Sequence, residues 1–181
     1  RVMEEGVQKG FTIWLTGLPG TGKTTILLLL EQRLLERSLR VELLDGDRPH
    51  PHPPGGRVSR QPDADADVGR IVAACRRLNR SGGACLVDDV SRSPIARDRA
   101  RRGVGDFIEV SVTSPLEKLI PREIPGDRDR ARAGRVARSA GSGDAEAVAA
   151  RADLVLDTEL DTAQAGVQMI LRVLEERGYL P

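Results

Sequence analysis

The chain has 181 residues, of which 39% are hydrophobic, 30% charged and 2% aromatic, with 28 basic against 27 acidic side chains. This composition excludes collagen-like, disulfide-framework and strongly disordered proteins, and the length predicts one compact domain over residues 1–181. The net charge of +1 gives no whole-chain electrostatic case for binding nucleic acid or an anionic membrane.

Two absences in the sequence predict the compartment. Cys75 and Cys85 are the only cysteines, too few for a disulfide scaffold or a zinc cluster. No apolar stretch approaches the ~20 residues that a membrane span needs. We therefore expect a cytoplasmic protein. The first residue is Arg1 rather than Met, which leaves open that the chain is part of a longer protein.

Five short apolar runs predict the strands of a sheet. They are mostly continuous rather than alternating, as expected of strands covered on both faces. The runs are Phe11–Thr16, Val41–Leu44, Ala84–Val87, Phe107–Val112 and Asp153–Leu156. Apolar residues at helical spacing predict helices at Thr24–Arg37, Val68–Leu78 and Gln164–Leu174. This alternation predicts an α/β three-layer domain with a mainly parallel five-stranded sheet.

Two segments interrupt the alternation. Residues 48–67 are rich in Pro, Gly and Asp and are predicted to form a loop. Residues 121–152 are rich in Arg and then in Gly, Ser and Ala, with no strand signal, and are predicted to form a lid. A further basic run, Arg97–Arg102, is interpreted as the solvated face of a helix, because it lacks the aromatic residues of a nucleic-acid site.

The first predicted strand is followed directly by a phosphate-binding loop. Gly17-Leu18-Pro19-Gly20-Thr21-Gly22-Lys23-Thr24 satisfies the pattern G-x-x-x-x-G-K-[ST] between a strand and a helix. Its glycines let backbone N–H groups surround a phosphate, and the helix N-terminus adds partial positive charge. We expect this loop and Thr25 to bind ATP, with Lys23 reaching the β- and γ-phosphates and the Thr24 hydroxyl holding Mg²⁺. The fold is thus predicted to be that of a P-loop NTPase.

Acidic residues stand at the ends of two other predicted strands. Asp47, in Asp45-Gly46-Asp47, follows the second strand. Because the carboxyl ends of parallel strands face the ligand, Asp47 is expected to orient an acceptor hydroxyl or to hold the metal. Asp88 and Asp89 end the third strand in the form of a Walker B motif. Whether this pair joins the metal shell or is a simple loop acid stays open at this point.

Several further segments follow in the order and spacing of one known family. They are Gly10–Leu18, Leu44–Asp47, Gly105–Val110, Pro115–Glu117, Ala131–Gly134, Ala152–Thr158 and Gly178–Leu180. With these segments the chain resembles the adenylylsulfate kinases, P-loop enzymes that phosphorylate the 3′-hydroxyl of adenosine 5′-phosphosulfate. The resemblance implies that Asp47 lies near the acceptor hydroxyl and that Arg122 clamps ATP. It also makes Ser91 a catalytic candidate, either as a phosphoserine or as a hydroxyl ligand.

The predicted acceptor side, residues 48–67, departs from the family pattern. Asp67 replaces an asparagine, and Asp63 and Asp65 stand with it where cations are expected for an anionic acceptor. Ala64 and Gly69 replace family arginines. Each lost charge-assisted hydrogen bond weakens binding by roughly 1.5–3 kcal/mol.

Three hypotheses of function follow. The first is an adenylylsulfate kinase that uses ATP and Mg²⁺ to make 3′-phosphoadenosine 5′-phosphosulfate for sulfate assimilation. The second is a P-loop kinase with another small-molecule acceptor, and the third is a non-catalytic nucleotide-binding regulatory domain. We favour the first. The resemblance also implies a homodimer or a fusion to an ATP sulfurylase domain as partners. From the charge and hydropathy of the sequence we expect no nucleic-acid or membrane partner.

Overall fold

A computed structural model of the chain describes residues 8–18, 20–45, 64–89, 94–114 and 151–181. The elements in chain order are β1 (Phe11–Thr16), α1 (Lys23–Glu36), β2 (Val41–Asp45), α2 (Ala64–Arg80), β3 (Ala84–Asp89), α3 (Pro94–Val104), β4 (Phe107–Thr113), β5 (Leu154–Asp157) and α6 (Ala163–Glu176). The predicted lid, apart from residues 151 and 152, and most of the predicted loop 48–67 lie outside the described residues.

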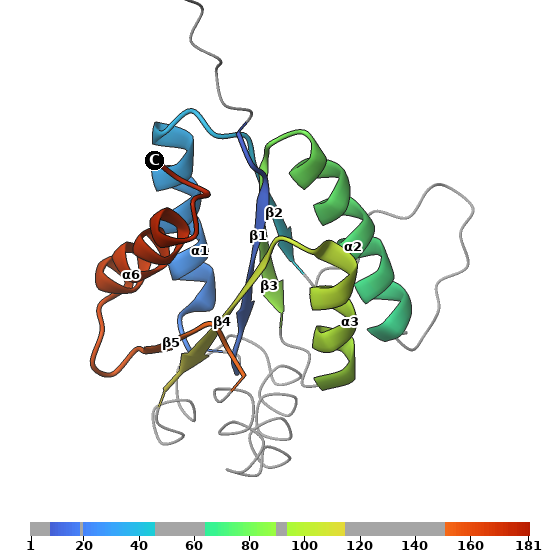
Figure 1. The fold of residues 1–181 in the computed structure, drawn as a ribbon. Helices are drawn as coiled ribbons and strands as arrows, with labels where there is room; N and C mark the ends of the chain where they lie inside the picture. The colour runs from blue at the N-terminus through green and yellow to red at the C-terminus, as the bar shows by residue number, and fades with distance from the viewer. Residues whose placement is uncertain (1–7, 19, 46–63, 90–93, 115–150) are drawn as a thin grey trace, which may run out of the picture.

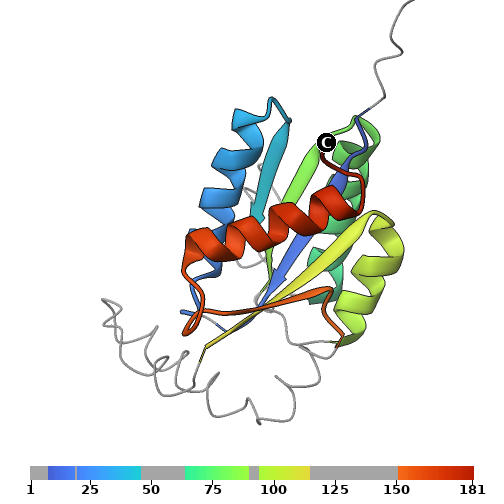
Figure 2. The same ribbon diagram turned by 60° about the vertical axis from the view of Figure 1, so that its left-hand side comes forward.

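The five strands form one sheet in the order β2-β3-β1-β4-β5, and every neighbouring pair is parallel. Helices α1 and α6 cover one face of the sheet, and α2 and α3 cover the other, as Figure 1 and the turned view of Figure 2 show. The predicted α/β three-layer architecture with five strands is confirmed. Its central strand is β1, which leads into the predicted phosphate loop.

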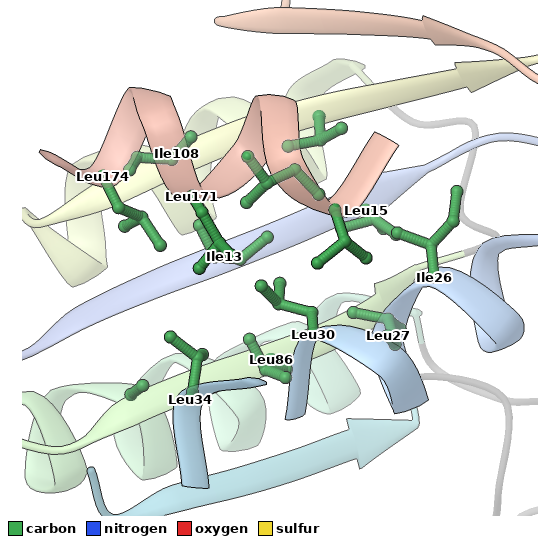
Figure 3. Packing of buried hydrophobic residues seen from close by; sticks show 14 of the residues in the cluster. Ile13, Leu15, Ile26, Leu27, Leu30, Leu34, Leu86, Ile108, Leu171 and Leu174 are labelled. Carbon is green, nitrogen blue, oxygen red and sulfur yellow. The ribbon is translucent and has the colours of Figure 1, made fainter. Parts of the chain in front are cut away.

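The face covered by α1 and α6 holds an apolar core. Alternate residues of β1 point into it, including Ile13 and Leu15, and meet leucines of α1 such as Leu30 and Leu34. These side chains are almost fully buried, because α1 repeats its leucines at helical spacing on the side that faces the sheet. Figure 3 shows Leu171 and Leu174 of α6 packed into the same core.

The opposite face holds a second core that contains charge. Trp14 of β1 packs against Phe107 of β4 there, with ring centroids 5.4 Å apart. In the same layer Arg97 of α3 is only 6% exposed and Glu109 of β4 only 4%. The Arg97 Nε lies 3.2 Å from the Glu109 Oε1, and Arg101 Nη2 lies 3.0 Å from Oε2. The interpretation of Arg97–Arg102 as a solvated helix face is therefore wrong at Arg97, which a buried carboxylate neutralises.

A second correction concerns the start of α2. The helix begins at Ala64, so the last four residues of the predicted loop 48–67 belong to its first turn. Their alternation of Ala and Asp indicates helix as well as loop, since Ala is the best helix former and acids are favourable near a helix N-terminus. The Pro and Gly residues earlier in the segment dominated the sequence-based interpretation.

Asp153, the residue before β5, connects this strand to three other elements. Its carboxylate accepts hydrogen bonds from the Glu109 backbone N–H at 2.8 Å, from Arg101 at 3.1 Å and from Arg177 at 2.8 Å. Burial raises the pKa of Asp153, but these hydrogen bonds outweigh it and the net pKa lies below the ordinary value of 3.8. The start of β5 is thereby tied to α3, β4 and the end of α6.

The buried pair of Arg97 and Glu109 generates a stability prediction. Arg97→Ala leaves the Glu109 carboxylate without this partner in the core, so we expect the free energy of unfolding to fall by about 3–5 kcal/mol. Urea denaturation measures it. The matched control is Arg99→Ala on the exposed side of the same helix, expected to change it by less than about 0.5 kcal/mol. Equal effects of the two substitutions would contradict the arrangement.

Asp153 generates a pH prediction. Since its folded-state pKa is lowered, its contribution to stability is present above pH 3.8 and is lost as the pH falls through the lower folded value. We therefore expect Asp153→Asn to be less stable than the wild type at pH 7, with the difference shrinking in acid. Urea denaturation at pH 7 and below pH 3.8 tests this. A difference that stays constant or grows below pH 3.8 would show that the carboxylate charge is not the cause.

Candidate active site

The phosphate loop follows β1 and begins α1 within a few residues. Gly17, Gly20 and Gly22 have φ values of 152°, 84° and 91°. Gly22 is the N-cap of α1 in the left-handed conformation, and no side chain caps the helix there. The N–H groups of the first turn thus have no side-chain acceptor from the cap and can bind an anion. Thr21 stabilises the turn, because its hydroxyl donates to the Leu18 carbonyl at 2.8 Å.

Lys23 lies inside the loop with 5% of its surface exposed. Its amine donates hydrogen bonds to the Gly17 carbonyl at 3.0 Å and to the Leu18 carbonyl at 3.1 Å. It also lies 3.7 Å from the Asp88 Oδ1. The charge that a P-loop directs at phosphate is therefore held at the mouth of the loop, between the backbone and a carboxylate.

Thr24 and Asp88 meet across the same opening. The Thr24 hydroxyl donates to the Asp88 Oδ2 at 3.1 Å, which joins the start of α1 to the end of β3. The other oxygen, Oδ1, is buried and has no hydrogen-bond partner among the described residues, although Lys23 lies nearby. A hydroxyl beside a carboxylate with an unused oxygen is the donor set that Mg²⁺ takes from P-loop proteins. The residues present thus fit a magnesium ion.

The alternation of β3 separates the two acids that the sequence left undecided. Asp88 lies beside Leu15 in the register and faces the α1 side. Asp89 points to the opposite face, where its Oδ2 accepts a hydrogen bond from the Trp14 indole N–H at 2.8 Å. Asp89 is 5% exposed. Of this pair, the geometry favours Asp88 for a metal shell and gives Asp89 a structural contact.

A third strand end reaches the loop from the other side. The Thr158 N–H and hydroxyl both donate to the Thr113 carbonyl, at 3.0 and 3.1 Å. A Cβ placed on Gly22 would lie 3.8 Å from the Thr158 methyl carbon. Sequence reasoning gave Thr113 and Thr158 no role. The available signal was their position at the carboxyl ends of β4 and β5, next to the predicted ligand edge.

The remaining predicted site residues differ in what the structure says of them. Thr25 lies on the exposed side of the first turn of α1. Pro19, Asp47, Ser91 and Arg122 lie outside the described residues, so their roles stay predictions. Within the described part of the chain, no three His, Cys, Asp or Glu side chains form a metal-binding group. A metal at Thr24 and Asp88 would therefore need phosphate oxygens or water to complete its shell.

The described helices include none that combines the length and apolar character needed to cross a bilayer. Lys23, Thr24 and Asp88 lie together at the carboxyl edge of the sheet. Figure 1 shows β1, β3 and β4 pointing toward that edge together.

Comparison with known proteins agrees with this geometry. The family model described as Adenylylsulphate kinase matches residues 9–157. An adenylyl-sulfate kinase of Rippkaea orientalis is 38% identical over 173 residues, which cover 96% of each chain. A probable bifunctional SAT/APS kinase of Sorangium cellulosum is 32% identical over 95% of this chain, which spans only 30% of that protein.

A solved structure is similar over nearly the whole chain. It is that of the Mycobacterium tuberculosis APS kinase CysC in complex with AMPPNP and APS, and it matches with a TM-score of 0.71 and 26% identity. The match covers 92% of this chain and 98% of that one. Because the family model matches residues 9–157 and the Rippkaea orientalis relative is 38% identical over 96% of each chain, the chain belongs to the adenylylsulfate kinase family.

Proposed function

We propose that this protein transfers the γ-phosphoryl group of MgATP to the 3′-hydroxyl of adenosine 5′-phosphosulfate, giving 3′-phosphoadenosine 5′-phosphosulfate for sulfate assimilation. The observation that carries the proposal is the meeting of Lys23, Thr24 and Asp88 at the mouth of the phosphate loop. Membership of the adenylylsulfate kinase family supports the choice of acceptor. The Mycobacterium tuberculosis relative was solved with both AMPPNP and APS.

Lys23 is the residue that would bind the transferred phosphate. Among the described residues, its amine donates hydrogen bonds to the neutral carbonyls of Gly17 and Leu18. Hydrogen bonds from an ammonium to phosphate oxygens are roughly twice as strong as neutral ones, so the β- and γ-phosphates compete well for its N–H groups. In a buried position the Lys23 charge is poorly screened and stabilises the charge that develops on the transferred group.

Thr24 and Asp88 would hold the magnesium ion through a hydroxyl and a carboxylate oxygen. When bound, Mg²⁺ neutralises the phosphate charge and aligns the β- and γ-phosphates for in-line transfer. Asp88 has a second effect, because it lies 3.7 Å from the Lys23 amine and keeps that cation at the opening. The Asp88 carboxylate would thus interact with both the Lys23 ammonium and the magnesium ion.

The acceptor side of the proposal rests on residues beyond the strand ends. Asp47 is two residues after β2, whose Asp45 pairs in register with Asp88. We propose that Asp47 orients the acceptor hydroxyl or contributes to the metal shell. Ser91, two residues after β3, is proposed as a catalytic hydroxyl on the acceptor side, and Arg122 as a clamp on ATP.

The first test of the proposed function is acceptor-dependent release of ADP. With MgATP, we expect ADP release to require adenylyl sulfate. Lys23→Ala is expected to lower kcat by roughly 10²–10³-fold, since it removes one pre-positioned cation. The matched control is Arg33→Ala, on the exposed side of the same helix, with unchanged activity expected. ATP binding without turnover on adenylyl sulfate would overturn the proposal, and an acceptor screen would then separate another kinase from a regulatory domain.

The second test separates the two neighbouring acids. Asp88→Asn keeps the shape of the side chain and removes its charge, so we expect the Mg²⁺ concentration for half-maximal activity to rise by about 10–100-fold. Asp89→Asn is the control, because Asp89 faces Trp14 on the other side of the sheet. It is expected to leave the Mg²⁺ dependence unchanged and to alter the fluorescence of Trp14, the only tryptophan. The opposite pattern would assign the metal to Asp89.

A further inference from the structure

The two cysteines of the chain lie in direct contact although they belong to different elements. Cys75 is on α2 and Cys85 is on β3. Their sulfur atoms are 2.9 Å apart, and the side chains are 0% and 1% exposed. They are ten residues apart in the chain, on either side of the turn that joins α2 to β3. Both thiols are free, and the sequence holds no other cysteine that competes for either of them.

Close packing of α2 on the sheet explains how the sulfurs meet. One helical turn after Cys75, the backbone of Asn79 lies against Gly10, just before β1. A Cβ on Gly10 would clash with the Asn79 carbonyl oxygen, so only glycine allows this approach. Thr12, which pairs in register with Cys85, is also hydrogen-bonded to the Asn79 side chain. The contact between the thiols is therefore held by a well-packed part of the fold.

We propose that Cys75 and Cys85 are an oxidisable dithiol, which a small peroxide converts into an intramolecular disulfide that joins α2 to β3. A disulfide bond is about 2.05 Å long, so the sulfurs need to approach by about 0.9 Å. The oxidant has to be small because both thiols lie in the core, where a glutathione-sized molecule does not fit. Hydrogen peroxide meets that condition and supplies the two oxidising equivalents.

The chemistry balances in two steps. The Cys75 thiolate attacks one peroxide oxygen, and hydroxide leaves and takes a proton to become water, which gives a sulfenic acid at Cys75. Cys85 then loses its proton and attacks the Cys75 sulfur, forming the S–S bond and releasing a second water. Two thiols and one hydrogen peroxide thus give one disulfide and two waters. Each sulfur loses one electron, and both electrons end on the peroxide oxygens.

The contact also distinguishes the two thiols. The hydrogen bond shared with Cys85 lowers the pKa of the Cys75 thiol, against the effect of burial. The same hydrogen bond, with burial, raises the pKa of the Cys85 thiol. The thiolate is the nucleophile in such reactions, so we expect Cys75 to attack the peroxide and Cys85 to resolve the sulfenic acid.

The disulfide would restrain a unit that borders the active site. Helix α2 begins directly after residues 46–63, which include most of the predicted acceptor segment. Asp88, the penultimate residue of β3, contacts Thr24. A covalent bond between α2 and β3 suppresses opening of the helix away from the sheet. We therefore expect α2 to open less often in the oxidised protein than in the reduced one.

Peroxide treatment of the native full chain tests the proposal. After quenching, the protein is unfolded, alkylated with N-ethylmaleimide and digested with trypsin, which separates the cysteines because Arg76, Arg77 and Arg80 lie between them. We expect loss of two hydrogen atoms in mass, no alkylation, and peptides 71–76 and 81–92 joined. Dithiothreitol is expected to reverse all three. In the oxidised protein, melting is expected several degrees higher and amide exchange in α2 slower.

Single variants identify the order of attack. Cys85→Ala is expected to accumulate a Cys75 sulfenic acid that reacts with dimedone, whereas Cys75→Ala is expected to give little adduct and no joined peptides. The proposal is overturned if both wild-type thiols still alkylate at a peroxide dose that oxidises methionine. Sulfinic or sulfonic acids in place of joined peptides would overturn it equally.

Discussion

The backbone of β1 is hydrogen-bonded to β3 on one side and to β4 on the other, and all three strands run parallel. The carboxyl ends of the three strands therefore lie at one edge of the sheet. Residues distant in sequence meet there. The β1 strand leads into the loop that contains Gly17 and Lys23, and β3 places Asp88 at the same opening. The active-site geometry is therefore a consequence of strand register. A shift of one residue in β3 would turn Asp88 to the α2 face and direct Asp89 at the loop.

The two faces of this sheet carry different kinds of core, and the difference follows from a period of two. On the α1 and α6 face, alternate residues of β1 pack into an apolar cluster. On the other face, the Trp14 indole N–H donates a hydrogen bond to Asp89. Glu109, which pairs in register with Trp14, forms an ion pair with Arg97. A buried ion pair gains little net stability because both charges lose their water. Its effect is rather to fix α3 on β4, since any other placement of the helix leaves Glu109 unpaired.

Sequence reasoning predicted the sheet, its parallel strands and the phosphate loop, because continuous apolar runs and a glycine motif are local signals. It failed at Arg97, where an arginine-rich run is typical of a solvated helix. The partner of Arg97 is Glu109 on the next strand, and no local pattern reveals that contact. The choice between Asp88 and Asp89 needs less information from the structure. It depends on which face each side chain takes, and alternation along β3 decides that once the helix on each face is known.

The scarcity of aromatic residues constrains how the protein holds purines. All four aromatic side chains lie in the described residues, and all are engaged in packing. Phe11 packs on Tyr179 on one face, and Trp14 packs on Phe107 on the other, with ring centroids 5.4 Å apart in each pair. Since none of the four is exposed to stack on a base, both adenines of the proposed reaction must be held by aliphatic, polar or arginine contacts. Arginine planes stack on bases as well as pairing with phosphate, which suits a chain whose basic residues are mostly arginine.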